Sequence, residues 1–294
     1  MMPDIERSEK SSEPSPEEIN EAVQNLKGWI SKEPHLPQID DEEWLKTFFF
    51  NNKFSLEKTK SKLDAYYSLR SKYPRILKNW DPNAPEMAPF RDNIHISPKL
   101  TADGDRVAVI RHDPDPDKFV MEDHVKYIMM CLDLSLLEKE RLASYIWVLD
   151  CRNFQYTHFL KVVLGMKPAS EILIEAYTER IESINLVNVP SFIGLAMKTI
   201  MPFYPEKLTS RVRVHNPFDN SLIELIGEDA LYTDLGGKGP SYAECAEWTF
   251  KKLEQRRKWF EDQDNVCSDE QLRKKENGHQ LDEMRGSFRK LEVD

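Results

Sequence analysis

The sequence lacks the long apolar runs, paired cysteines and apolar leader that mark membrane and secreted proteins. No apolar run among its 294 residues reaches the roughly 18–20 that a membrane span requires. Its four cysteines, Cys131, Cys151, Cys245 and Cys267, are widely spaced and form no CxxC pair. We therefore expect free thiols, no metal site and a reducing compartment. The polar first 18 residues predict no secretory signal and hence a cytoplasmic protein.

Positive charge is also scarce. The 41 Lys and Arg against 51 Asp and Glu give a formal net charge of −10, whereas broad nucleic-acid binding needs a basic footprint. We therefore expect no nucleic-acid partner. Apolar residues make up 40% of the sequence, which is enough for a sizeable core in one large domain or two smaller ones.

The usual catalytic and nucleotide-binding motifs are absent as well. No G-x-G-x-x-G, G-x-S-x-G or H-E-x-x-H occurs, and GGKG at Gly236–Gly239 lacks the upstream Gly and the following Ser or Thr of a P-loop. Asp150 ends an apolar strand, where α/β enzymes often place catalytic groups, and His158 is its candidate partner. A capping role for Asp150 is the favoured interpretation. We predict that the protein is not an enzyme and has no catalytic residues, metal or cofactor.

The first third of the chain has the pattern of a small helical domain. Residues 1–15 are rich in Ser, Glu and Pro, which predicts a disordered leader. Helices are expected to start at Pro16 and Ser55, where a first-turn proline and a capping residue precede apolar residues at helical spacing. The N-terminal helical domain is thus predicted over 16–80. Four prolines mark 81–99 as a connector.

Strands alternate with helices in the lobe predicted over 100–240. The near-continuous apolar strand 145–150 is typical of a sheet buried on both faces. The alternation predicts an α/β fold with a mostly parallel sheet and flanking helices. A C-terminal helix and tail follow over 241–294. The expected strands are 106–112, 145–150, 183–189 and 212–215, and the expected helices are 119–136, 156–164, 169–180, 190–203 and 221–225.

The segment 177–237 is the most informative part of the chain. An apolar helix, Pro190–Phe203, lies between two strands and is followed by a basic corner, Glu206–Arg211. A second helix is expected to end in LYTDLGG, Leu231–Gly237. Because no group here has the pattern of a nucleophile or metal ligand, the segment indicates a lid over an apolar cavity.

One stretch of the helical region and three of the lobe, in the right order, resemble phrases of a known family. The DEEWLKTFFFNNKFSLEKTKSKLDAYYSLRSKYPRIL stretch is similar to the helical leader of the CRAL-TRIO (Sec14-like) lipid-transfer proteins. SINLVNVP, MPFYPEKLTSRVRVH and LYTDLGG resemble that family's lipid-binding lobe. The resemblance covers about residues 16–262, and the nearest branch is that of the tocopherol and retinaldehyde transfer proteins. KFSLEKTKSKLDAYYSLR and GSFRKLEVD resemble insect members of this branch.

The resemblance implies a deep apolar pocket closed by a mobile gate helix, here Val189–Tyr204. Its walls are expected from strand 145–150 and helices 119–136 and 169–180, with ordinary core packing as the alternative role of each side chain. Tyr127, Tyr177 and Cys131 would favour a ligand with one hydroxyl or carbonyl. The predicted ligand-binding residues are Tyr127, Cys131, Trp147, Leu149, Ile172, Leu173, Tyr177, Phe192 and Met197, and the predicted gate residues are Ile193, Leu195, Ala196, Ile200 and Met201.

Relatives in this branch bind phosphoinositide headgroups in a basic cleft beside the gate. The resemblance assigns this role to Arg180, Lys207 and Arg211, with an ordinary solvated surface as the alternative. Each cation near a membrane surface contributes about 1 kcal/mol of attraction to anionic lipid. The sequence departs from the family where Phe50, Asn52 and Glu182 replace cations.

The favoured prediction is a soluble intracellular carrier, monomeric, that binds a tocopherol-, retinoid-, carotenoid- or other isoprenoid-like lipid and exchanges it during transient contact with membranes. A phosphoinositide-binding membrane adaptor without a transported ligand is the first alternative. An enzyme acting near Asp150 and His158 is the second.

Overall fold

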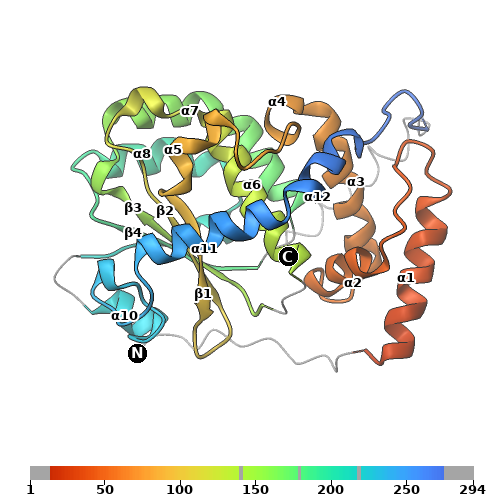
Figure 1. The fold of residues 1–294 in the computed structure, drawn as a ribbon, viewed down its shortest axis with the longest axis horizontal. Coiled ribbons are helices and arrows are strands. Elements are labelled where there is room, and N and C mark those ends of the chain that lie inside the picture. Colours follow the sequence, from red (N-terminus) through yellow and green to blue (C-terminus); the bar gives the residue numbers. More distant parts are fainter. Residues whose placement is uncertain (1–13, 139–141, 178–179, 217–219, 275–294) are drawn as a thin grey trace, which may run out of the picture.

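The computed structural model places most of the chain, in a helical region and a sheet-containing lobe (Figure 1). The predicted leader falls almost entirely outside the described residues, as does much of the predicted tail. The structure describes residues 14–138, 142–177, 180–216 and 220–274.

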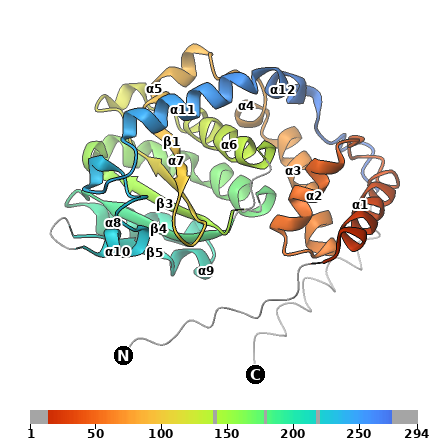
Figure 2. The ribbon, with the colours of Figure 1, turned by 60° about the horizontal axis from the view of Figure 1, so that its bottom comes forward.

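The predicted N-terminal helices are confirmed, and their first residues are capped as the sequence indicates. Ser15 forms a capping box with Glu18 before α1, and Asp41 and Ser55 accept hydrogen bonds from the first turns of α2 and α3. These helices stand to one side of the lobe in both ribbon views (Figure 2). The elements are α1 (Pro16–Ile30), α2 (Glu42–Asn51), α3 (Leu56–Lys72) and α4 (Pro74–Leu77).

The lobe contains a five-stranded sheet in the order β1-β2-β3-β4-β5. β1 is antiparallel to β2, and the other neighbouring pairs are parallel, so the predicted α/β class is confirmed. The strands are β1 (Ile94–Leu100), β2 (Arg106–Ile110), β3 (Tyr145–Asp150), β4 (Ile181–Val187) and β5 (Val212–Val214).

Strand β1 was not predicted, because it lies within the proline-rich stretch taken for a connector. Pro98 lies inside the strand, and the pairing with β2 shifts between Ile96 and Leu100. Proline cannot donate to a ladder and is tolerated at an edge strand or an irregularity, and β1 provides both. The short helices η1 (Pro85–Met87) and α5 (Ala88–Arg91) precede it.

The two faces of the sheet are covered by different helices. On one face, Val107, Val109, Ile146 and Val148 pack against α10 and the segment that follows it. The other face meets α6 and α7. The remaining helices are η2 (Pro116–Lys118), α6 (Met121–Leu137), η3 (Cys151–Asn153), α7 (Tyr156–Glu171), η4 (Ile172–Ala176), α8 (Ile193–Ile200), η5 (Met201–Phe203), α9 (Glu206–Thr209), α10 (Ser221–Ile226), η6 (Thr233–Leu235), α11 (Tyr242–Gln255), α12 (Arg257–Asp262) and η7 (Gln263–Asn265).

Two helix boundaries differ from the prediction. The helices expected over 156–164 and 169–180 are one continuous α7, which contains Pro168 and ends in the π-helical turn η4. A π-helical turn changes the hydrogen-bond register of a helix, here close to a proline. The helix expected to end in LYTDLGG stops at Ile226. The LYTDLGG segment is a tight turn, where a Cβ on Gly237 would lie 2.0 Å from the Leu231 carbonyl oxygen.

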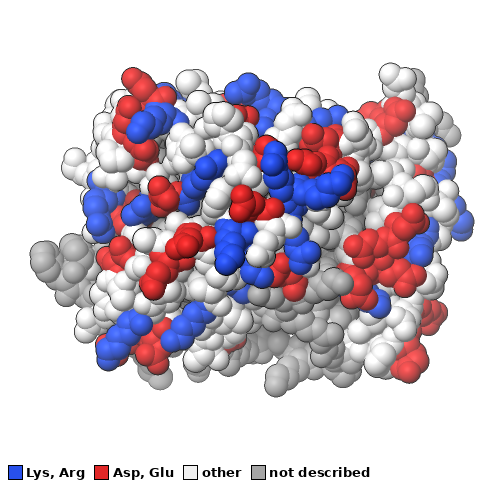
Figure 3. All heavy atoms as spheres, in the orientation of Figure 1, with Lys and Arg blue, Asp and Glu red and all other residues white. Residues whose placement is uncertain are grey.

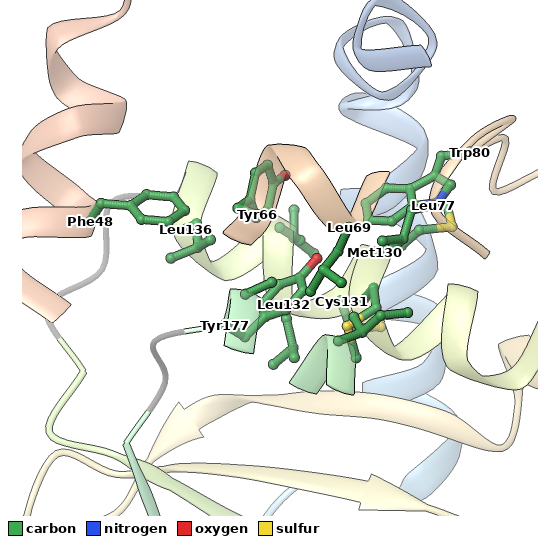
Figure 4. Packing of buried hydrophobic residues seen from close by; sticks show 14 of the residues in the cluster. Phe48, Tyr66, Leu69, Leu77, Trp80, Met130, Cys131, Leu132, Leu136 and Tyr177 are labelled. Carbon is green, nitrogen blue, oxygen red and sulfur yellow. The ribbon is translucent and has the colours of Figure 1, made fainter. Parts of the chain in front are cut away.

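A buried polar cluster joins the helical region to the lobe. The Tyr66 hydroxyl on α3 donates to Asp133 on α6 at 2.6 Å, and Arg70 donates to the Tyr66 oxygen at 3.0 Å. Burial raises the pKa of Asp133 to about 6. Figure 4 shows Tyr66, Leu69 and Tyr177 gathered over Leu132 and Cys131. This packing fixes α6 against α3.

Charged side chains of both signs are interspersed over the face seen in Figure 3. This face, over α11, shows no broad basic footprint among the residues that are described. Its ion pairs are local, such as those of Glu138 with Lys252 and Arg256.

Acid sensitivity of the fold is predicted from His95. This β1 side chain is fully buried between Tyr232 and Tyr242, and neither ring nitrogen hydrogen-bonds any described residue. Burial lowers its pKa to about 3, whereas the unfolded residue titrates near 6.5. The free energy of unfolding is therefore unaffected by His95 above pH 6.5. It decreases as the pH falls from 6.5 toward 3, because the unfolded state then binds a proton that the buried His95 does not.

Lowering the pH from 7 to 5 should reduce the free energy of unfolding of the parent protein. We predict that this reduction is about 2 kcal/mol smaller in His95→Phe. Urea titrations at the two pH values measure the difference. Equal losses in both proteins would show that His95 is not the titrating group.

Candidate ligand cavity and gate

A cavity of about 280 Å³ lies between the sheet and helices α6, α7 and α8. The register of the parallel strands explains its floor, since Ile110 pairs with Leu149 and Leu149 pairs with Leu186. Paired residues point to the same face of a sheet, so these three form one row beneath the cavity. Trp147 and Ile184 form the next row.

The walls come from two long helices. Val125, Ile128 and Met129 of α6 face the cavity from one side. Val162 and Met166 of α7 face it from the other. Apolar side chains dominate the lining, so the space suits an apolar molecule.

Helix α8 closes the cavity. Ile193, Ala196, Met197 and Ile200 line it with the i, i+3, i+4, i+7 spacing of one helix face. Met201 continues this face. Leu195 points away and is 50% exposed.

Contacts at both ends hold the gate segment against α7 and against Phe154, which precedes that helix. At the N-terminal end, the Phe192 ring lies 5.6–6.2 Å from the rings of Phe154, Tyr156 and Phe159. At the other end, the Tyr204 hydroxyl contacts the Met166 sulfur at 3.3 Å. Burial raises the pKa of Tyr204 to about 12. Ring contacts and a weak sulfur hydrogen bond are individually small attachments.

The structure brings about half of the predicted ligand-binding residues to the cavity. Trp147, Leu149, Leu173 and Met197 line it, as do the predicted gate residues Ile193, Ala196, Ile200 and Met201. Phe192 lies at the gate anchor instead. Tyr127, Cys131, Ile172 and Tyr177 are buried in the core and are not among the lining residues.

The two tyrosines therefore do not supply the expected polar contacts at the lining. Tyr177 lies beside Tyr66 and hydrogen-bonds Asp133 in the junction with α3. Tyr127 lies next to Phe90. Tyr127 lies on α6, and Tyr177 follows η4 with an extended backbone. The sequence reasoning also missed His112 and His124, which do line it.

The three predicted phosphoinositide-binding cations have different surroundings. The Arg211 guanidinium donates to the carbonyl of Ile181, and Arg180 stacks over Phe50 at 5.9 Å. Lys207 is exposed on α9. Phosphoinositide binding by these residues stays a prediction.

Asp150 has the capping role that the sequence favoured. It accepts hydrogen bonds from the backbone of Arg152, from Asn188 and from Tyr242, at 2.9–3.2 Å. The His158 Nδ1 accepts instead from the backbone of Gln155 at 3.1 Å. Structural donors thus occupy Asp150 and the Nδ1 atom of His158, whereas the His158 Nε2 atom is buried and hydrogen-bonds no described residue.

The described residues contain no cluster of three or more His, Cys, Asp or Glu side chains arranged to hold a metal. None of their helices is both long enough and apolar enough to cross a bilayer.

Comparisons with known proteins assign both regions. Residues 96–237 match the CRAL/TRIO domain, and residues 15–87 match the Pinta-like UBA domain. The predicted resemblance to the CRAL-TRIO family is thus confirmed over residues 96–237. The resemblance to insect members stays a prediction.

Its curated relatives are distant. Alpha-tocopherol transfer protein-like from Homo sapiens is 26% identical over 227 residues, covering 73% of this chain and 64% of that protein. The match thus spans less than two thirds of that relative. Clavesin-1 from Xenopus laevis is 23% identical over 252 residues, covering 81% and 74%. The crystal structure of Sfh5 covers 83% of this chain and 99% of its own, with a TM-score of 0.48 and 12% identity.

Filling the cavity is predicted to abolish ligand binding. Ala196 is 2% exposed and lines the hollow, whereas Leu195 on the same helix is half exposed. Ala196→Trp should place an indole in the empty space and weaken binding of the apolar dye anilinonaphthalene sulfonate at least tenfold. Fluorescence titration measures the binding, with Leu195→Trp as the matched control. Equal dye binding by the two variants would contradict the assignment of the cavity.

Proposed function

We propose that this chain binds one hydrophobic small molecule in the cavity behind α8 and exchanges it at membranes. The observation that carries the proposal is the apolar hollow of about 280 Å³ beneath that helix. Its relatives support it, since one is named for tocopherol transfer.

The energetics of lipid transfer explain why such a cavity is useful. At ~0.8 kcal/mol per buried CH₂, exposing about twenty carbons to water costs roughly 16 kcal/mol. An apolar cavity offers an equivalent environment and removes most of this barrier. The cavity of about 280 Å³ is slightly smaller than the range of roughly 300–1,000 Å³ for ligand sites, which favours a slender or compact isoprenoid-like molecule.

The gate would open by releasing its two small attachments. Asn188, at the end of β4, has φ 52° and therefore occupies the left-handed region just before the gate segment. Its side chain is tied to Asp150 at 2.9 Å. A fixed pivot there and weak contacts at Phe192 and Tyr204 allow α8 to swing while the sheet stays in place.

The outer surface beside the gate suits a membrane. Leu160 and Leu164 on α7 are 48% and 86% exposed, and Leu195 and Phe203 on the gate segment are 50% and 40% exposed. α7 and α8 contact one another, so these side chains belong to neighbouring elements. Exposed apolar groups around a cavity entrance would enter the membrane interface when the gate opens.

Removing this apolar surface should slow exchange without emptying the cavity. We predict that Leu160→Ser/Leu164→Ser lowers the rate of retinol transfer between phosphatidylcholine vesicles several-fold and leaves dye binding unchanged. Fluorescence transfer from donor to acceptor vesicles measures the rate. Leu272→Ser, at an equally apolar residue that is 53% exposed, is the control. Equal transfer by all three proteins would contradict a membrane role for α7.

A further inference from the structure

Two histidines are among the few polar residues that line the mostly apolar cavity. His112 follows β2, and His124 lies in the first turns of α6, and both line the hollow. Their rings are stacked, with centroids 5.7 Å apart and planes at 17°. Two separate elements thus bring a pair of imidazoles to one place in the wall.

Aromatic rings surround this pair. Phe119 lies 5.3 Å from His112 and 5.0 Å from His124, measured between ring centroids. Phe154 lies 4.8 Å from His112, and Phe90 lies 5.6 Å from His124. Aromatic rings thus cover much of both imidazoles, and the two residues also border the cavity.

The imidazole Nδ1 atoms of both residues are buried and hydrogen-bond no described residue. His124 as a whole is only 7% exposed. A buried polar atom without a partner costs about 1–3 kcal/mol, and such atoms in folded proteins call for an explanation. A polar atom on a bound ligand would supply the missing bond.

Both imidazoles are neutral at ordinary pH. Burial lowers the pKa of His124 to about 3 and the pKa of His112 well below its usual value, and the neighbouring imidazole of His158 lowers both further. A neutral imidazole offers one N–H donor and one acceptor nitrogen. The pair can therefore match a hydroxyl or a carbonyl, whereas it has no positive charge to balance a buried carboxylate.

We propose that His112 and His124 hydrogen-bond the single hydroxyl or carbonyl of an uncharged ligand and fix which end of the molecule enters the cavity first. This inference rests on the proposed function and names the residues that recognise the polar end of the ligand. They would favour one uncharged hydroxyl or carbonyl group over a hydrocarbon or a fatty acid. The inference moves the polar contact from Tyr127 and Tyr177 to the two histidines.

Three molecules with one carbon skeleton test the proposal: farnesol, farnesene and farnesoic acid. Displacement of anilinonaphthalene sulfonate from the full chain measures each affinity. The parent protein is expected to bind farnesol at least tenfold more tightly than either of the other two. His124→Phe and His112→Phe, which keep a ring and remove the nitrogens, should each lower farnesol affinity about tenfold and leave farnesene affinity unchanged.

The control separates polar recognition from damage to the fold. Phe119→Leu alters the same enclosure without a polar change and should shift all three affinities alike. His124→Phe should also melt at an equal or higher temperature, because it removes a buried nitrogen that hydrogen-bonds no described residue. Loss of a purely structural contact would instead lower the melting temperature.

Equal binding of the three molecules by the parent, or equal weakening of all three in the histidine variants, would overturn the assignment and leave the carrier function standing. Binding of none of them would contradict the carrier function as well.

Discussion

The hollow under α8 is the constraint on which the rest of the structure depends. At about 24 cal/mol per Å³, the increment measured for cavities in T4 lysozyme, an enclosed dry space of 280 Å³ would cost on the order of 7 kcal/mol. The net stability of a protein is only about 5–15 kcal/mol. A sequence that keeps such a space open must therefore gain its stability elsewhere, and a molecule that fills the space regains much of the loss.

The arrangement of layers shows where that stability comes from. The face of the sheet opposite the hollow is packed solidly by Val107, Ile146 and Val148 against Leu222 and Leu231. On the side of the hollow, α6 is fixed from behind through its contacts with α3. The helices of the N-terminal region thus hold one wall in place, whereas α8, which we propose as the gate, is attached by small contacts at its ends.

Much of this fold could be predicted from the sequence because its signals are local. Caps such as Ser15 and Ser55 mark helix starts, and the apolar run of β3 marks a central strand. β1 escaped prediction because Pro98 opposes a strand locally, whereas pairing with β2 and packing against α11 favour it. The Thr249 hydroxyl on α11 bonds the backbone N–H and carbonyl of Ile96, a contact across the chain that no local pattern reveals.

The cavity wall was harder to predict than the gate. The gate presents one apolar face, so its lining residues follow from helical spacing. α6 is buried nearly all round, and a helix without a polar face does not reveal which side meets a hollow. Tyr127 lies on a different face of α6 from His124 and Ile128, which line the cavity. Cys131 shares the face of these two residues but lies farther along the helix than Met129, the last α6 residue in the lining.

The most direct test of the account is to extract the purified protein with organic solvent and identify what is released by mass spectrometry. The account predicts close to one uncharged hydrophobic molecule per chain, and a lower melting temperature for the stripped protein that returns when the molecule is added back. Recovery of nothing, or of polar phospholipids alone, with no change in melting temperature, would contradict it.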